Sequence, residues 1–284
     1  MNSQNTHPLF EVVTTTAGAI SIRNKDLNEI MHNPVGPWKE ANALYIEPSG
    51  LVGRLSQKSN EPFVLFDVGL GAAANSLAAL HCYYRHQAAR PLRLISFEKD
   101  LELLRFALGH AEVFEHFRGY EEAMTTLLEK GIWESGPVQW ILREGNFLTR
   151  IQKETERPHL IFYDPYSMTV NSEMWTVDCF RLIRKLCRQS EEGGTLLLNY
   201  SRATPFRSAL FLAGFAVGKG PATGLKDETT QAATSIDLLS EPLGAQWLQR
   251  WERSHTKMPP ESTPEQWPDM ESFIRGHAQL RSRL

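Results

Sequence analysis

The sequence predicts an α/β protein with a mainly parallel β-sheet and helices on both faces. Five short apolar runs are typical of buried strands, and several segments between them carry apolar residues at helical spacing. The expected strands cover residues 63–68, 92–97, 138–142, 160–163 and 195–199. The expected helices cover residues 72–86, 100–110 and 176–189. Strands that alternate with helices in this way form parallel sheets, because a parallel pair needs a long crossover connection.

Segments of a different character flank this α/β region. Residues 11–23 are rich in β-branched side chains on either side of Ala17-Gly18, a pattern that predicts an N-terminal β-hairpin. Prolines and glycines interrupt residues 24–53 and leave room for one short helix, near residues 38–45. An amphipathic stretch and a proline-rich stretch near the end predict a C-terminal helical extension. We therefore expect three units, namely a hairpin with a lid or linker (1–60), a core (61–240) and an extension (241–284).

Composition and charge limit the class of protein. The chain has 284 residues, of which 42% are hydrophobic and 22% charged, and its formal net charge is −3. These values are ordinary for a globular protein, and a nucleic-acid partner would need a local basic patch. The longest apolar stretches fall far short of the roughly 20 residues that a bilayer requires. The polar first residues do not resemble a secretory signal, so we expect a cytoplasmic protein with no membrane contact.

Cysteine and histidine usage favours neither disulfides nor a metal centre. The cysteines, Cys82, Cys179 and Cys187, are too few and too scattered for a disulfide framework, and none has a CxxC partner. The nine histidines show no HExxH or comparable ligand spacing. We expect buried, reduced thiols and no bound metal.

The first expected strand ends in a glycine loop that is typical of nucleotide-binding proteins. Asp67-Val68-Gly69-Leu70-Gly71 follows the apolar run and precedes the first helix. Glycines let the backbone approach a ligand, and the N-terminus of the following helix supplies N–H groups. The alternative is a turn without a ligand, because such loops also serve to reverse the chain. Alanine replaces the third glycine of a dinucleotide fingerprint, so the loop does not specifically indicate NAD.

Polar side chains also follow the next strands. Glu98 ends the second strand, where a carboxylate can accept both hydroxyl protons of an adenosine ribose; the alternative is a solvated turn residue. Asn146, after the third strand, is a candidate for the adenine or for a cap of its own loop. Asp164 follows the fourth strand, at the edge where open α/β sheets bind ligands. A carboxylate at an apolar strand tip needs a partner, which makes Asp164 the best catalytic candidate.

Together these motifs resemble the bacterial tRNA 5-methylaminomethyl-2-thiouridine methyltransferases, the MnmC type. The family pattern has a glycine loop after a strand, a strand that ends in an acidic residue, and a downstream D-x-F-x-P-x-x-N-P-E-x-W signature. Residues 164–175 read DPYSMTVNSEMW and keep the Asp, aromatic, Asn, Glu and Trp positions in order. The resemblance covers roughly residues 10–233.

Some positions depart from the family pattern. Pro165 stands where a small residue is usual, and Met168 and Ser172 replace prolines. These departures concern the loop around the substrate more than the cofactor. The family's larger members carry a second, flavin-dependent oxidoreductase domain, for which we expect no room in a chain of 284 residues.

The resemblance implies a Rossmann-like, S-adenosylmethionine-dependent N-methyltransferase. Its substrate would be the 5-aminomethyl group of the tRNA wobble uridine, converted to 5-methylaminomethyl(-2-thio)uridine, and a separate oxidoreductase would supply the aminomethyl intermediate. The cofactor-binding residues would be Asp67, Gly69, Gly71, Glu98, Asn146 and Asp164. The catalytic residues would be Asp164, which orients the amine, and Tyr166. The contacts to the anticodon region would come from Tyr166, Asn171, Glu173, Trp175, Arg202 and Lys226.

Several alternatives stay open. Tyr166 and Trp175 either stack on an extruded base or pack in the core. The basic face of the helix over residues 176–189 is either a solvated surface or a phosphate-binding one. A phosphate-binding surface would combine Arg181, Arg184, Lys185 and Arg188 with Arg202, Arg207, Lys219 and Lys226. The rival functions are a small-molecule methyltransferase, an inactive cofactor-binding module and an NAD-dependent oxidoreductase.

Overall fold

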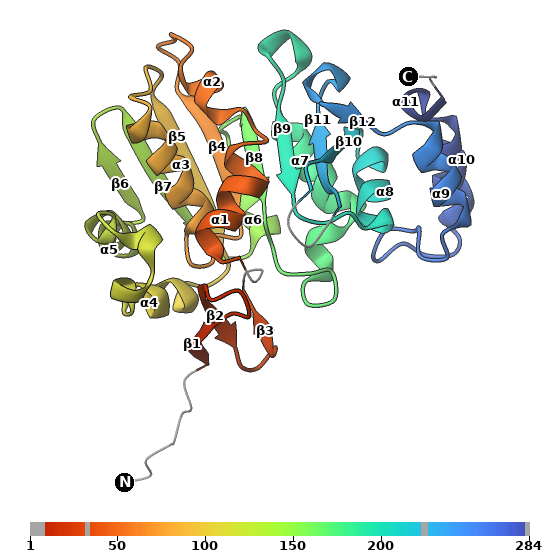
Figure 1. The fold of residues 1–284 in the computed structure, drawn as a ribbon. Helices are drawn as coiled ribbons and strands as arrows, with labels where there is room; N and C mark the ends of the chain where they lie inside the picture. The colour runs from red at the N-terminus through yellow and green to blue at the C-terminus, as the bar shows by residue number, and fades with distance from the viewer. Residues whose placement is uncertain (1–8, 32–34, 223–226, 282–284) are drawn as a thin grey trace.

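The computed structural model describes residues 9–31, 35–222 and 227–281, and its centre is a nine-stranded sheet (Figure 1). The strand order is β12-β10-β11-β9-β8-β4-β5-β7-β6. Every neighbouring pair from β9 to β7 is parallel, whereas β11, β12 and β6 each run antiparallel to their neighbours. The predicted α/β class with a mainly parallel sheet is therefore confirmed.

The apolar runs of the sequence form the central strands. These are β4 (Phe63–Val68), β5 (Leu92–Glu98), β7 (Val138–Glu144), β8 (Leu160–Tyr163) and β9 (Leu196–Asn199). Every residue of β4, β8 and β9 is buried, as expected for strands covered on both faces. The sheet also contains strands that the sequence did not predict, namely β6 (Ile132–Ser135), β10 (Ala216–Gly220), β11 (Thr229–Ala233) and β12 (Glu241–Pro242).

Helices cover both faces of the sheet because successive strand residues point to opposite sides. Leu65 and Leu94 belong to one buried cluster, together with residues of α3 (Ala74–Arg85), α4 (Glu102–Leu108) and α5 (Glu121–Lys130). Phe66 and Ile95 belong to the other, which also contains residues of α6 (Phe147–Ile151), α7 (Val177–Leu186) and α8 (Thr204–Leu212). Short 3₁₀-helices complete this region: η2 (Ala111–Val113), η3 (Glu115–Phe117), η4 (Ser172–Trp175), η5 (Ser190–Glu192) and η6 (Ile236–Leu238).

A small N-terminal sheet lies at one end of the central strands (Figure 1). It contains the predicted hairpin of β1 (Phe10–Thr14) and β2 (Ile20–Asn24), to which β3 (Glu29–Ile30) adds a third strand. The ring of Phe10 packs 5.8 Å from that of Phe106 in α4, and the Tyr166 hydroxyl lies 3.4 Å from the sulfur of Met31. The small sheet thus borders the loops that follow β5 and β8.

The chain then enters the core layer before the first central strand begins. It passes through α1 (Pro37–Ala41), the π-helix η1 (Asn42–Ile46) and α2 (Leu51–Leu55). The expected short helix is therefore present, but a π-helical turn interrupts it. Its residues Leu44 and Tyr45 are 5% and 1% exposed and share a cluster with α3, so this segment is part of the core.

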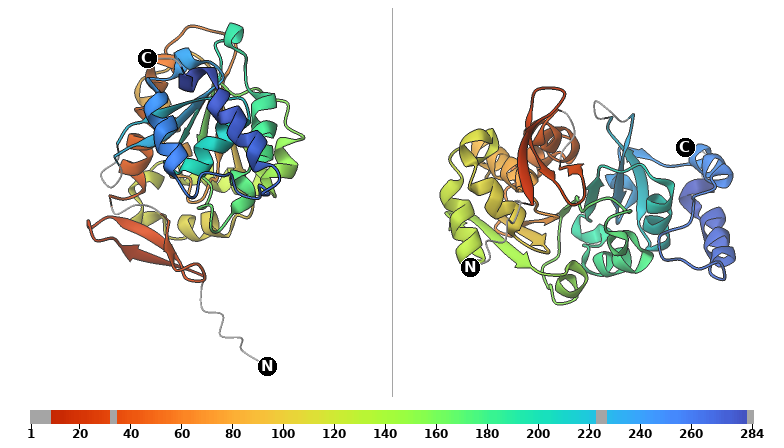
Figure 2. Two further views of the ribbon diagram at one scale, coloured as in Figure 1. Left: turned by 90° about the vertical axis from the view of Figure 1, so that its right-hand side faces the viewer. Right: turned by 90° about the horizontal axis from the view of Figure 1, so that it is seen from below.

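The C-terminal residues form the predicted helical extension, with α9 (Ala245–Arg253), α10 (Trp267–Gly276) and α11 (Ala278–Arg281). These helices lie at the far end of the sheet from α5 (Figures 1 and 2). Trp251 Nε1 donates to Ser208 Oγ of α8 at 2.8 Å, and the buried Gln279 side chain bonds the backbone of Val217 in β10. The division at residues 60 and 240 remains a prediction.

Two further findings concern the described part of the chain. None of its helices is long and apolar enough to cross a membrane. Within residues 9–31, 35–222 and 227–281, no group of three or more His, Cys, Asp or Glu side chains is placed to hold a metal ion. Cys82, Cys179 and Cys187 are buried free thiols.

Candidate active site

The loop after β4 passes directly against the loop after β8. Gly69 has φ +90°, and a Cβ built there would lie 2.5 Å from the carbonyl oxygen of Asp164. No side chain fits into that space, so only glycine permits this contact between the two loops. Gly71 also has positive φ, at +53°, and so does Ala73, at +60°, which is unusual for a residue with a side chain. The backbone of the glycine loop is thus held in a shape that it would not adopt freely.

Asp67 supports this loop from behind. Its side chain is fully buried, and its Oδ2 accepts hydrogen bonds from Ser76 of α3 at 2.5 Å and Ser96 of β5 at 3.2 Å. Within the described residues Oδ1 has no hydrogen-bond partner. A direct cofactor contact was expected for Asp67, but a carboxylate without exposed surface is better interpreted as a brace between β4, β5 and α3.

Burial gives Asp67 a measurable effect on stability. It raises the pKa of this carboxyl to about 7, although the two serine hydroxyls oppose the shift. Because the folded pKa exceeds that of the unfolded chain, the contribution to stability is complete below about pH 4 and is lost as the pH rises through 7. Between about pH 4 and pH 7 the free energy of unfolding of the wild-type protein should therefore decrease by as much as roughly 4 kcal/mol because of Asp67. Asp67→Asn has no carboxyl at this position and should not show this decrease. Denaturant titrations of both proteins across this pH range would test the prediction. The same dependence of the free energy of unfolding on pH in both proteins would contradict it.

Glu98 faces the same loop from the next strand. Its Oε2 accepts a hydrogen bond from Gly71 N at 2.9 Å, and its Oε1 accepts one from Lys99 N at 2.7 Å. Burial raises the pKa of the Glu98 carboxyl, while these backbone bonds oppose the shift. Asn146, by contrast, is exposed and caps α6, since its Oδ1 accepts from Thr149 N at 3.1 Å. Asn146 therefore caps its own helix, as one of the two alternatives proposed. A contact of Asn146 with adenine stays a prediction.

Asp164 stands at the carboxyl end of β8, next to the glycine loop. Its backbone N donates to Val68 O at 2.8 Å, and its Oδ2 accepts from Asn75 Nδ2, also at 2.8 Å. Tyr45 and Tyr200 lie close by, and after the effect of burial the charge of Asp164 raises the pKa of both hydroxyls. Asn75 and Tyr45 were not predicted as site residues. The only signal for Asn75 was a polar residue on the buried side of an alanine-rich helix.

The segment after Asp164 brings its aromatic residues together in an unexpected way. Trp175 is 1% exposed, and its ring packs against Phe206, with ring centroids 5.0 Å apart. Its Nε1 donates to the Tyr166 carbonyl at 3.0 Å. A ring buried in this way presents no face to an incoming base, so the stacking role predicted for Trp175 is wrong and the core-packing alternative holds. Tyr166 is only partly buried and remains the candidate for contact with the substrate.

Asn171 and Glu173 interact with each other. In the amide orientation that satisfies both groups, Asn171 Nδ2 donates to Glu173 Oε1 at 2.6 Å and to Oε2 at 3.0 Å. The backbone of this turn is closed by Asn171 N, which donates to Ser167 O at 3.0 Å. The two side chains thus hold the loop that follows Tyr166, and a contact of either with the substrate stays a prediction.

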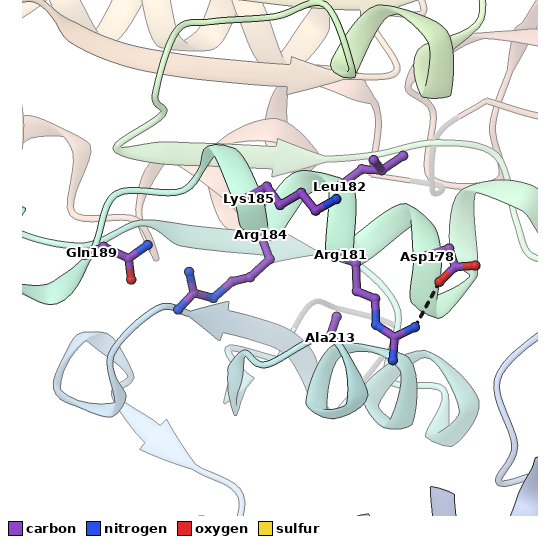
Figure 3. A pocket seen from close by; sticks show the side chains of 7 residues that line it. All are labelled: Asp178, Arg181, Leu182, Arg184, Lys185, Gln189 and Ala213. Atoms are coloured by element: carbon purple, nitrogen blue, oxygen red, sulfur yellow. Dashed lines mark hydrogen bonds and ion pairs between the residues drawn. The ribbon is translucent and has the colours of Figure 1, made fainter.

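Several of the basic residues considered for a phosphate-binding surface are engaged by other groups in the described part of the chain. Arg181, Arg184 and Lys185 line a cavity of about 570 Å³ on the outer side of α7 (Figure 3). Arg181 pairs with Asp178 at 3.0 Å, and Arg184 donates to the Gly214 carbonyl at 3.2 Å. Most of this charge is therefore engaged within the fold.

The other basic residues are also engaged or dispersed. Arg188 pairs with Glu61, just before β4, so the helix leads away from Asp164 toward the amino end of the sheet. Arg207 is 2% exposed and pairs with Glu228 at 2.9 Å, so it cannot belong to a surface. Arg202 is exposed and pairs with Asp227, and Lys219 pairs with Glu241. Lys226 lies outside the described residues.

Comparisons with known proteins agree with this geometry. A family model described as S-adenosyl-L-methionine-dependent methyltransferase matches residues 134–235. An uncharacterised protein of Methanocaldococcus jannaschii is 29% identical over 223 residues, which are 78% of this chain and 58% of that protein. The tRNA 5-methylaminomethyl-2-thiouridine biosynthesis bifunctional protein MnmC of Burkholderia multivorans is 28% identical over 203 residues, or 67% of this chain and 30% of that protein.

A solved structure shows the same fold. MNMC2 from Aquifex aeolicus superposes with a TM-score of 0.71 at 21% identity, covering 95% of this chain and 86% of that one. Fold, site and family model together define the chain as an S-adenosylmethionine-dependent methyltransferase. Over about 30% of their length, MnmC proteins resemble this chain. The chain spans about 58% of its archaeal relative and about 30% of the bifunctional MnmC protein.

The residues at this edge fit S-adenosylmethionine. The loop after β4 carries no side chain at Gly69 or Gly71, and both N–H groups are bonded within the fold: Gly69 N donates to Phe97 O at 3.0 Å and Gly71 N donates to Glu98 Oε2 at 2.9 Å. A carboxylate at this position suits the two hydroxyls of a ribose. These three residues are therefore the ones that would hold the cofactor.

Proposed function

We propose that this chain methylates the 5-aminomethyl group of the wobble uridine in tRNA, in the cytoplasm, to give 5-methylaminomethyl(-2-thio)uridine. The observation that carries the proposal is the placement of Asp164 against Gly69, at the edge where the cofactor would bind. The match to MnmC proteins, whose printed name refers to 5-methylaminomethyl-2-thiouridine biosynthesis, supports the choice of substrate.

The charges around Asp164 favour an amine as the methyl acceptor. The carboxylates of Asp164 and Glu40 act on the hydroxyls of both Tyr45 and Tyr200, and that of Glu29 acts on Tyr200. An environment with this excess of negative charge attracts a protonated amine and repels an acidic acceptor. It therefore supports an N-methyltransferase.

S-adenosylmethionine supplies a methyl group on a sulfonium when it is bound. The part played by the chain is then mainly alignment and the exclusion of water. Asn75 fixes Asp164 Oδ2, so the carboxylate can accept a hydrogen bond from the amine and direct its lone pair. The same carboxylate can take the proton that the nitrogen releases after methylation. Tyr166, which lies beside the N-terminal sheet, would contact the uridine.

The remaining contacts of the proposal involve the macromolecular partners. Asn171 and Glu173 would shape the loop near the base, and Arg202 and Lys226 would contact the tRNA backbone. A separate oxidoreductase would supply the aminomethyl group. The small-molecule methyltransferase and the inactive binding module are the alternative outcomes of the test below.

The decisive test offers labelled S-adenosylmethionine and two tRNAs that differ only at the wobble position, one carrying 5-aminomethyluridine and the other uridine. Nucleoside analysis should find label in 5-methylaminomethyluridine from the first tRNA alone. Label in free amines but not in tRNA would favour a small-molecule enzyme. Cofactor binding without any transfer to either tRNA or amines would favour the binding module.

A separate prediction concerns the ribose contact. Glu98→Ala should weaken S-adenosylmethionine binding about 10-fold to 100-fold and leave the fold intact, because a hydrogen bond to a charged group contributes about 1.5–3 kcal/mol. Titration calorimetry would measure this change. Glu102→Ala, an exposed position at the start of α4, is the matched control and should leave the affinity unchanged. Equal affinities in both variants would refute the ribose assignment, and stabilisation of the wild-type protein by NAD would support the oxidoreductase alternative.

A further inference from the structure

Tyr45 carries a buried hydroxyl that lies beside the Asp164 carboxylate. Its side chain is 1% exposed, and its ring packs on Phe162 of β8 with ring centroids 5.1 Å apart. Within the described residues the hydroxyl makes no hydrogen bond of good geometry, although the Asp164 carboxylate lies beside it. A buried hydroxyl without a partner costs about 1–3 kcal/mol, and a phenylalanine at this position would avoid that cost.

The surroundings of this hydroxyl point to Asp164 as its partner. Phe162, which the Tyr45 ring contacts, lies two residues before Asp164 on the same strand and loop. Asn75 holds the carboxylate from α3, whereas Tyr45 approaches from η1, so the two side chains come from different elements. The neighbouring Tyr200 hydroxyl is already engaged, since it donates to the Pro165 carbonyl at 3.1 Å.

We propose that Tyr45 is a positioning residue for methyl transfer, whose hydroxyl donates a hydrogen bond to Asp164 and fixes the carboxylate toward the incoming amine. This inference rests on the proposed function of Asp164. The carboxylate alone has two rotatable bonds, and a second donor in addition to Asn75 would restrict its orientation before the acceptor arrives. A hydrogen bond donated to a carboxylate also favours its ionised form over the protonated one.

Titratable groups from several packed elements surround this pair. Asp67 of β4 faces Asp164, and so do the hydroxyls of Tyr45 and Tyr200. Glu40 of α1 and Glu29 of β3 face the tyrosine hydroxyls. Each of these groups is neutral or negative, so loss of the Tyr45 donor should raise the pKa of Asp164.

The first test needs no substrate. The carboxyl carbon of Asp164 is titrated by NMR in the full chain, with Asp164→Asn used to assign its signal. Tyr45→Phe, which keeps the ring, should raise the titration midpoint by roughly half to one pH unit. The control is Tyr83→Phe, because Tyr83 in α3 also has a buried hydroxyl without a partner among the described residues. An equal midpoint in wild-type, Tyr45→Phe and Tyr83→Phe proteins would overturn the proposal.

The second test measures turnover on tRNA that carries 5-aminomethyluridine. Tyr45→Phe should lower kcat about 10-fold to 100-fold, leave the KM for S-adenosylmethionine within about 2-fold, and move the acidic limb of the pH profile upward. If the wild-type protein does not methylate this RNA, the proposed function fails, while the NMR titration still decides whether Tyr45 bonds Asp164. A higher midpoint with unchanged kcat would overturn the positioning role. Unchanged kcat with a more stable protein would show that the hydroxyl is only an unsatisfied group.

Discussion

Asp164→Asn should keep the fold and most of the affinity for S-adenosylmethionine but lower turnover by about 10²-fold to 10⁴-fold. Asparagine has nearly the same shape and can still accept the hydrogen bond from Asn75, so the loop should stay in place. It cannot take a proton from the methylated amine, and it attracts the amine less strongly. The loss therefore falls on the transition state, and kcat and kcat/KM should decline together.

Single-turnover kinetics and calorimetry on the same variant would separate rate from binding. Binding of the cofactor serves as the internal control, because it reports whether the edge of the sheet is still assembled. If Asp164→Asn retains wild-type turnover on the true substrate, Asp164 is not the catalytic carboxylate. Tyr166 would then be the better candidate.

Gly69→Ala should nearly abolish methyl transfer and also destabilise the protein. The added Cβ would lie 2.5 Å from the carbonyl oxygen and 2.9 Å from the carbonyl carbon of Asp164, and these backbone atoms cannot rotate away. The two loops must therefore separate, which displaces both the cofactor edge and the catalytic carboxylate. We expect activity to fall by more than about 100-fold and the free energy of unfolding to decrease by about 2–4 kcal/mol.

A matched substitution isolates the steric part of this effect. Gly119 has φ +84°, close to the +90° of Gly69, but a Cβ there would meet nothing within 4 Å. Gly119→Ala should lower the free energy of unfolding by only about 1–2 kcal/mol, the cost of a left-handed conformation, and should leave activity unchanged. Similar losses of activity in both variants would show that the contact with Asp164 is unimportant.

The central fold was predictable because its strands are apolar throughout. β4 and β8 read as continuous hydrophobic runs, and the carboxyl ends of parallel strands necessarily meet at one edge, which brings Gly69, Glu98 and Asp164 together. β11 could not be recognised in the same way. Its residues TTQAA are all buried although three are polar, because Arg207 bonds Thr229 O and Thr230 Oγ1 from α8.

The candidate site was predictable only where a residue's place in a strand fixes its position. Asn75 meets Asp164 across 89 positions of sequence, and nothing in the periodicity of α3 identifies its partner. Asn75 was missed, whereas Trp175 was wrongly included. Its aromatic side chain follows the catalytic candidate Asp164 in sequence and was predicted to contact the substrate, but it lies in the core. Spacing indicates which residues are close along the chain, but packing decides which of them face a ligand.

The path of the chain between Pro37 and Leu55 bears on which part of this protein can fold autonomously. This stretch adds six buried side chains to the same hydrophobic cluster as α3 and β8, namely Ala41, Leu44, Tyr45, Ile46, Leu51 and Leu55. Excision at residue 60 would leave the apolar surface beneath them facing water. We therefore expect a truncated protein that begins at residue 61 to be less stable than one that keeps residues 37–60, unless another segment fills the same space.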